Sequence, residues 1–242
     1  MAAEDRTFGE FNARDRTQHP PAFAPTYKTS VLRSPRNALI SLQNSLSEIT
    51  APMFSSDELG ELDHDLILNY SKGGLPIGER IIVHGHVLDE FGRGVPNALV
   101  EVWQANAAGR YRHSGDRHPA PLDPNFTGFG CTLTDAEGRY RFITIRPGAY
   151  PWKNHENAWR PAHIHFSVFG RSVAERLVTQ MYFPDDPLFS QDPIFNAVSD
   201  PAARQRLVAR FAIEHTVPEW ALGFTFDIVL GGRDRTPADP RP

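Results

Sequence analysis

The sequence predicts an all-β protein: an antiparallel β-sandwich core with long loops, an irregular N-terminal arm and one short helix near the C-terminus. Short runs of alternating or β-branched residues recur from residue 79 onward, separated by turns that contain Gly, Pro and Asp. Only the segment 202–213 has a clear helical spacing of apolar residues. Many short strands with so little helix are typical of two packed antiparallel sheets.

The composition fits one domain with appendages. The chain has 242 residues, of which 40% are hydrophobic, enough to bury a substantial core. Its 25 basic and 29 acidic residues form no long run of either sign, so we expect no nucleic acid or membrane partner. The single cysteine, Cys131, excludes an intrachain disulfide and a thiolate metal cluster. The polar N-terminus and the lack of a long apolar run favour a cytoplasmic protein.

Residues 1–62 form the expected N-terminal arm, and residues 63–242 the sandwich domain. The arm has many Pro, Ser and Asn residues and no sustained period, although Leu39, Leu42, Leu46 and Ile49 follow a helical spacing for a short way. Such a segment cannot bury a core by itself. We therefore expect it to wrap the domain or to lie against a partner subunit.

The first strands are expected in two β-hairpins. The run 79–89 is rich in β-branched residues and ends at a Gly/Pro turn before the second run, 99–105. The segment 130–145 repeats the pattern, with Asp135 and Gly138 at a tight turn where glycine suits a positive φ.

Three more strands and one helix complete the expected elements. The strands lie at 163–170, 176–183 and 223–232. The helix at 202–213 begins at Asp200-Pro201 and places Ala203, Leu207 and Phe211 on one face. Two irregular connections, 105–127 and 147–162, are longer than a hairpin needs, and loops on a rigid β scaffold are the usual place for a site.

Two pairs of histidines have the spacing of a candidate metal site. His163 and His165 are one residue apart on an expected strand, so both imidazoles project from the same face. His84 and His86 have the same spacing on another strand. The spacing therefore permits metal binding at either pair and does not choose between them.

The surroundings favour the second pair. Tyr150, Trp152 and Arg160 lie shortly upstream of His163 in a proline-containing loop, whereas the first pair has aliphatic neighbours. A loop and strand that present Tyr, Arg and two His to one volume are hard to explain by packing, because each buried polar group needs a partner. Tyr150 considered alone is also explained as an amphipathic loop anchor.

The motifs WQANAAGRY (103–111), PGAYPW (147–152) and RPAHIHF (160–166) together resemble the intradiol ring-cleaving dioxygenases. The likeness covers nearly the whole chain. It implies a non-haem Fe(III) centre that splits the ring of a small catechol-type aromatic acid with O2. It also implies a homologous, iron-free alpha subunit that pairs with this chain in an (αβ)n assembly.

Carried over by motif, the resemblance implies roles for individual residues. The metal ligands it implies are Tyr111, Tyr150, His163 and His165, with Tyr150 also catalytic. Arg160 is implied to be catalytic and to line the substrate ring. The other implied substrate-binding residues are Tyr27, Trp152, Gln180 and Ile194. The pair His84 and His86 has no ligand role in the family.

The residue types suit this chemistry. Phenol has a pKa near 10, so a tyrosine ligates as tyrosinate only to a strongly acidic metal ion. Two anionic oxygens and two imidazoles favour a hard trivalent ion, whereas the 2-His-1-carboxylate set holds Fe(II). No acidic residue takes an HxD or HxE position beside His163, although a carboxylate from elsewhere in the chain stays possible.

Two other interpretations remain open from sequence. Catechol and hydroxyquinol dioxygenases share the chemistry, and a substrate panel separates them. A non-catalytic, transthyretin-like β-sandwich binding module resembles the segment 83–103 and the DAEGRYRF run (135–142), but this interpretation leaves the four Tyr and His residues unexplained.

Overall fold

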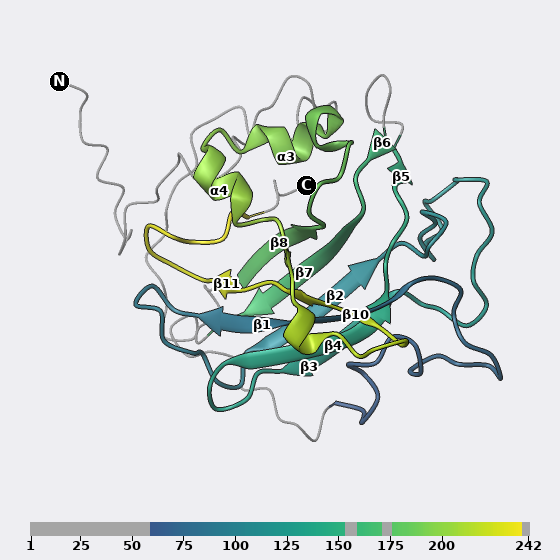
Figure 1. Ribbon diagram of the computed structural model, residues 1–242, viewed down its shortest axis with the longest axis horizontal. Coiled ribbons are helices and arrows are strands. Elements are labelled where there is room, and N and C mark those ends of the chain that lie inside the picture. Colours follow the sequence, from purple (N-terminus) through teal and green to yellow (C-terminus); the bar gives the residue numbers. More distant parts are fainter. Residues whose placement is uncertain (1–58, 153–158, 171–175, 239–242) are drawn as a thin grey trace.

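Strands make up most of the secondary structure in the computed structural model, which describes residues 59–152, 159–170 and 176–238 (Figure 1). The N-terminal arm up to residue 58, including Tyr27 and the short helical pattern around Leu42, lies outside the described residues. Among those described, no helix has the length and hydropathy needed to cross a membrane. The all-β prediction is confirmed.

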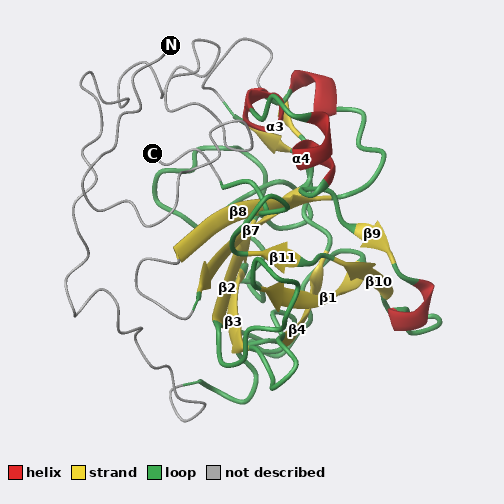
Figure 2. Ribbon diagram, turned by 90° about the vertical axis from the view of Figure 1, so that its left-hand side faces the viewer, coloured by secondary structure: helices red, strands yellow, loops and turns green. Residues whose placement is uncertain are grey.

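Two sheets lie face to face (Figure 2). One is wholly antiparallel, in the order β3 (Phe129–Leu133), β2 (Leu99–Gln104), β7 (His163–Phe169) and β8 (Arg176–Tyr182). The other is mixed: β1 (Arg80–Leu88) pairs antiparallel with β4 (Arg139–Ile145) and parallel with β10 (Leu222–Thr225) and β11 (Ile228–Val229), and β9 (Arg210–Phe211) pairs with β10. The antiparallel prediction therefore holds for one sheet and for part of the other.

Alternating side chains from the two sheets fill the space between them. The burial of β2 alternates residue by residue, as expected for a strand with one face on a core. Phe142 of β4 and Phe166 of β7, from opposite sheets, have ring centroids 6.4 Å apart, and Phe226 lies 5.2 Å from Phe166. These contacts form the centre of the sandwich core.

The expected first hairpin is wrong. The runs 79–89 and 99–105 lie in opposite sheets, because both edges of β1 are occupied by β4, β10 and β11, and both edges of β2 by β3 and β7. The Gly/Pro segment between them crosses from one sheet to the other. Turn residues report a reversal of the chain, but they do not say which strands pair afterward.

The second hairpin is correct at its turn and wrong in its pairing. The Gly138 N–H donates to the Asp135 carbonyl, and Gly138 has a φ of 80°. The strands on either side then separate, β3 into the antiparallel sheet and β4 into the mixed one. Backbone hydrogen bonds join residue 134 to residues 97 and 98, so the β3–β4 connection lies beside the β1–β2 connection.

The C-terminal helix is shorter than predicted. Two short helices, α3 (Pro193–Ala197) and α4 (Pro201–Gln205), follow the 3-10 turn η2 (Phe189–Gln191), and a further turn, η3 (Ile213–His215), precedes β10. Asp200 caps α4 as expected, accepting from the Ala202 N–H. The helix ends early because residues 207 and 209 bond to the backbone of Tyr182 at the end of β8, and a tertiary contact overrides helical spacing.

Cys131 lies partly buried in β3 beside Asp63, its Sγ 3.7 Å from the Asp63 carboxylate. Burial and the nearby acidic charge raise the pKa of the Cys131 thiol to about 11. The thiol is therefore protonated at neutral pH.

Candidate metal centre and substrate pocket

His163 and His165 project from the start of β7 with ring centroids 4.9 Å apart. The Nδ1 of His163 lies 2.7 Å from the Pro161 carbonyl oxygen, which can only accept, so Nδ1 carries the proton and Nε2 keeps its lone pair. The ring of His165 stacks on Trp103 of the neighbouring strand β2, with centroids 4.8 Å apart. Strand register and a backbone carbonyl thus orient both rings.

Tyr111 reaches this pair from the 105–127 loop. Asn106 organises the loop, because its side-chain oxygen accepts from the N–H groups of residues 108 and 110. The Tyr111 N–H donates to the buried Asp116 carboxylate at 2.8 Å. The Tyr111 hydroxyl then lies 3.2 Å from His163 Nε2.

Tyr150 approaches from the other loop and begins β5 (Tyr150–Pro151), which pairs with β6 (Trp159–Arg160). The backbones of the two tyrosine loops approach closely at Gly109, which has a φ of 75°. A Cβ at this position would lie 2.1 Å from the Ala149 carbonyl oxygen, so only glycine fits. This close approach brings the rings of Tyr111 and Tyr150 to 5.0 Å, edge to face.

The four predicted ligand residues therefore converge, with Tyr111 contacting each of the other three. Burial, followed by the charge of Asp116, raises the pKa of Tyr150, while Arg110 and Arg160 oppose this shift. Burial, with the positive charge of Arg160, holds the pKa of His163 well below its ordinary value.

This donor set fits a ferric ion. A neutral imidazole is the ligating form of histidine, and its lone pair faces the Tyr111 oxygen. Tyr150 has a raised pKa, so it becomes tyrosinate only where a cation compensates for the charge. In residues 59–152, 159–170 and 176–238, no three His, Cys, Asp or Glu side chains form a group that could hold a metal. The phenols of Tyr111 and Tyr150 are thus the oxygen donors beside the two imidazoles.

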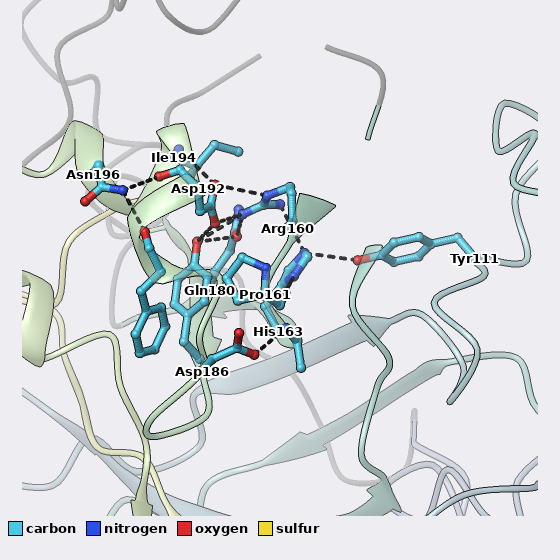
Figure 3. A network of polar contacts seen from close by, with 12 residues as sticks. Tyr111, Arg160, Pro161, His163, Gln180, Asp186, Asp192, Ile194 and Asn196 are labelled. Atoms are coloured by element: carbon cyan, nitrogen blue, oxygen red, sulfur yellow. Dashed lines mark hydrogen bonds and ion pairs between the residues drawn. The ribbon is translucent and has the colours of Figure 1, made fainter. Parts of the chain in front are cut away.

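Arg160 lies beside this set and is 4% exposed. Its Nη1 lies 3.0 Å from His163 Nε2, while Nη2 donates to Gln180, Tyr182 and Asp192 (Figure 3). The guanidinium also lies over Trp152, with Cζ 5.5 Å from the ring centroid. The predicted residues Trp152, Arg160 and Gln180 are therefore neighbours.

Ile194 reaches the same region from helix α3. It is 8% exposed, and its N–H donates to Asp192, the residue that bonds Arg160 (Figure 3). Of the predicted site residues, only Tyr27 lies outside the described part of the chain.

Sequence reasoning missed Asp192 and Tyr182, which complete the buried group around Arg160. Both are fully buried. Asp192-Pro193 has the same Asp-Pro pattern as Asp200-Pro201, so its capping of a helix could have been recognised from the sequence. Its contact with Arg160, across 32 residues, could not.

The alternative pair lies elsewhere, on β1 in the mixed sheet. His84 Nε2 is 3.0 Å from the Thr225 hydroxyl, and the ring of His84 lies 3.4 Å from that of His215. His86 Nδ1 is 3.1 Å from the Asp227 carboxylate. Hydrogen-bond partners on β10 and in the β10–β11 connection therefore occupy this pair.

Comparison with known proteins identifies the family of the chain. Residues 49–232 match the profile of a family described as Dioxygenase, and residues 13–45 match the N-terminal family of protocatechuate 3,4-dioxygenase beta subunits. The chain belongs to this dioxygenase family, which confirms the resemblance stated from its motifs.

Individual relatives make the assignment narrower. The chain is 58% identical over 226 residues to the protocatechuate 3,4-dioxygenase beta chain of Burkholderia cepacia, covering 93% of this chain and 96% of the relative. It is 30% identical over 161 residues to the alpha chain of the Pseudomonas putida enzyme, covering 66% and 75%. The solved 3-chlorocatechol 1,2-dioxygenase of Rhodococcus opacus 1CP, 24% identical, has a TM-score of 0.53 and covers 87% of this chain and 79% of its own, which supports the fold.

Proposed function

We propose that this chain is the iron-bearing subunit of a protocatechuate 3,4-dioxygenase, which uses O2 to convert protocatechuate (3,4-dihydroxybenzoate) to 3-carboxy-cis,cis-muconate. The observation that carries the proposal is the convergence of two phenols, two imidazoles and a buried guanidinium at one end of the sandwich. The 58% identity to a beta chain of this name favours protocatechuate over catechol or hydroxyquinol. A transthyretin-like binding module leaves this convergence unexplained.

Tyr111, Tyr150, His163 and His165 would hold the non-haem Fe(III). When bound, the iron would supply the Lewis acidity that stabilises a catechol dianion and makes its ring reactive toward O2. The Pro161 carbonyl and the Trp103 ring orient the two imidazoles toward the phenols.

Tyr150 is the residue that we assign as the base. Its phenolate oxygen accepts a proton from a hydroxyl of the incoming substrate. Burial and the nearby Asp116 raise the pKa of Tyr150, so the oxygen holds that proton firmly once it has accepted it.

Arg160 provides the positive charge next to the substrate ring. Because its guanidinium is buried, the charge acts on negative charge developing on the substrate with little screening by water. Trp152, Gln180 and Ile194 form the proposed pocket around it, and Tyr27 of the arm is the proposed contact for the substrate carboxylate.

A homologous alpha subunit is the proposed partner, in an (αβ)n assembly. The beta-chain name of the relative and the 30% identity to an alpha chain support such a pairing. The division at residue 62 and the cytoplasmic location stay predictions.

The test is iron analysis and a visible spectrum of the chain co-produced with an alpha subunit. Tyrosinate-to-Fe(III) charge transfer would colour the protein red-brown, and anaerobic protocatechuate would shift the band. A steady-state panel would give the highest kcat/KM for protocatechuate among protocatechuate, catechol and hydroxyquinol. A colourless preparation from iron-replete cells would contradict the metal assignment, and a preference for catechol would contradict the substrate.

A further inference from the structure

The guanidinium of Arg160 is held along one edge by a carboxylate. Nε lies 3.3 Å from Asp192 Oδ1 and Nη2 lies 3.0 Å from Oδ2, a side-on pair of parallel bonds. This pairing uses the edge opposite the candidate metal centre. It leaves Nη1 directed at His163 Nε2, 3.0 Å away (Figure 3).

Asp192 is itself fixed from several directions and is 0% exposed. Oδ1 also accepts from the Ile194 N–H at 3.0 Å, which caps helix α3, and Oδ2 also accepts from the Tyr182 hydroxyl at 3.1 Å. Each carboxylate oxygen thus lies within hydrogen-bond distance of two donor groups, and Gln180 shares the Tyr182 hydroxyl with Oδ2. A buried carboxylate satisfied in this way cannot rotate without losing several hydrogen bonds at once.

We propose that Asp192 is a positioning residue: its carboxylate sets the orientation of the Arg160 guanidinium toward the substrate, and its cap on α3 sets Ile194 against the same pocket. This inference rests on the proposed function of Arg160. A cation stabilises negative charge that develops on the substrate most effectively when it is already oriented before the reaction, because the protein then does not have to rearrange during the chemical step. Without the carboxylate, the guanidinium keeps its Nη2 bonds to Gln180 and Tyr182 but loses both bonds along its Nε edge, so its plane can tilt.

The decisive variant is Asp192→Asn, which keeps the size of the side chain. An asparagine has one acceptor oxygen, so its amide NH2 faces either Arg160 Nη2, or Arg160 Nε and the Ile194 N–H, donor against donor. Displacement of a group by about 1 Å can cost on the order of 100-fold in rate, so we expect kcat to fall by roughly 10-fold to 100-fold with little change in KM.

Asp200→Asn is the matched control. Asp200 begins α4 with the same Asp-Pro pattern, and its carboxylate likewise accepts from the N–H two residues on, at 2.9 Å. Unlike Asp192, it takes part in none of the ion pairs among the described residues. Its substitution is expected to lower the melting temperature slightly and leave kcat per iron unchanged. A kcat loss as large as that of Asp192→Asn would assign both effects to loosened helices and overturn the proposal.

A double-mutant cycle with Arg160→Gln separates positioning from a direct role. If Asp192 acts through Arg160, the double variant has the kcat of Arg160→Gln alone, in the iron-loaded assembled enzyme. Additive losses, or a normal kcat in Asp192→Asn, would overturn the proposal.

Crystal structures of the iron-loaded wild type and of Asp192→Asn give a second readout that does not depend on turnover. One guanidinium orientation is expected in the wild type and a displaced or split one in the variant. Two orientations in the wild type, or an unmoved guanidinium in the variant, would overturn the positioning role. If the wild type fails to cleave protocatechuate, the proposed function fails, while the orientation of Arg160 still decides the role of Asp192.

Discussion

The two His-x-His pairs of this chain have the same spacing and lie on strands of opposite sheets, yet their surroundings differ. The ring of His163 faces a tyrosine hydroxyl and an arginine, and its proton is fixed by a backbone carbonyl. The ring of His84 bonds a threonine and lies against a second histidine. Spacing brings two imidazoles to one face of a strand, and the residues that other segments bring there decide what the pair can do.

Removing one imidazole from each pair should give the largest difference between the pairs, measured as iron content. In His163→Ala the iron content is expected to fall to near zero, because a ligand is lost rather than a supporting residue, and supporting residues alone are worth about 10-fold to 100-fold in metal affinity. His84→Ala should keep a full complement of iron. Metal analysis of both purified variants measures this, and full iron occupancy in His163→Ala would refute its ligand role.

The proposed base is tested by Tyr150→Phe. The variant should retain iron through the three remaining ligands but lose about 100-fold to 10,000-fold in kcat, the usual contribution of a positioned base. Stopped-flow mixing with protocatechuate under anaerobic conditions measures how fast the substrate binds. Binding at the wild-type rate would argue against proton transfer to Tyr150.

A smaller effect should come from the rings and carboxylates that support each pair. Trp103→Leu removes the ring stacked on His165 and should weaken iron binding by about 10-fold, since groups that orient a ligand carry this much. Asp227→Asn, which alters the partner of His86, should leave iron affinity unchanged. Competition with an iron chelator compares the two. Equal losses would mean that general loosening, not orientation, explains the result.

The smallest effect is a pH dependence of stability at His84. Burial, followed by the positive charge of His215, lowers the pKa of His84 to about 4 from its ordinary 6.5; Asp227 and Glu214 oppose the shift and His86 adds to it. Between these values the unfolded chain binds a proton that the folded chain does not. The free energy of unfolding therefore falls as pH drops from 6.5 toward 4.

His84→Asn removes this contribution. Urea denaturation at pH 7 and pH 5 should show a smaller loss of unfolding free energy in the variant than in the wild type. The same loss in both proteins would mean that other groups cause the acid sensitivity.

Local pattern predicted most of the strands, whereas the candidate site residues came from motifs that resemble a known family. Alternation along segments such as 99–104 reports which face is buried. The motifs around Tyr111 and Tyr150 fall in the long connections, and the motif around His163 runs into the start of β7. The four predicted ligand residues do converge. Their ligand roles stay predictions.

The errors concern contacts between distant segments. The runs 79–89 and 99–105 were expected to pair as a hairpin, but both edges of β1 are taken by strands more than 50 residues away, which no local turn signal reports. The helix at 202–213 ends early for the same reason, because Leu207 and Ala209 bond to Tyr182. Asp192 was missed since its role depends on Arg160, far away in sequence.

The raised pKa of Cys131 has a consequence for an enzyme that handles O2. Only the thiolate reacts readily with peroxide, and with a pKa of about 11 that form is scarce at neutral pH. Beside Asp63, the one sulfhydryl group of the chain is thereby kept slow to react with peroxide.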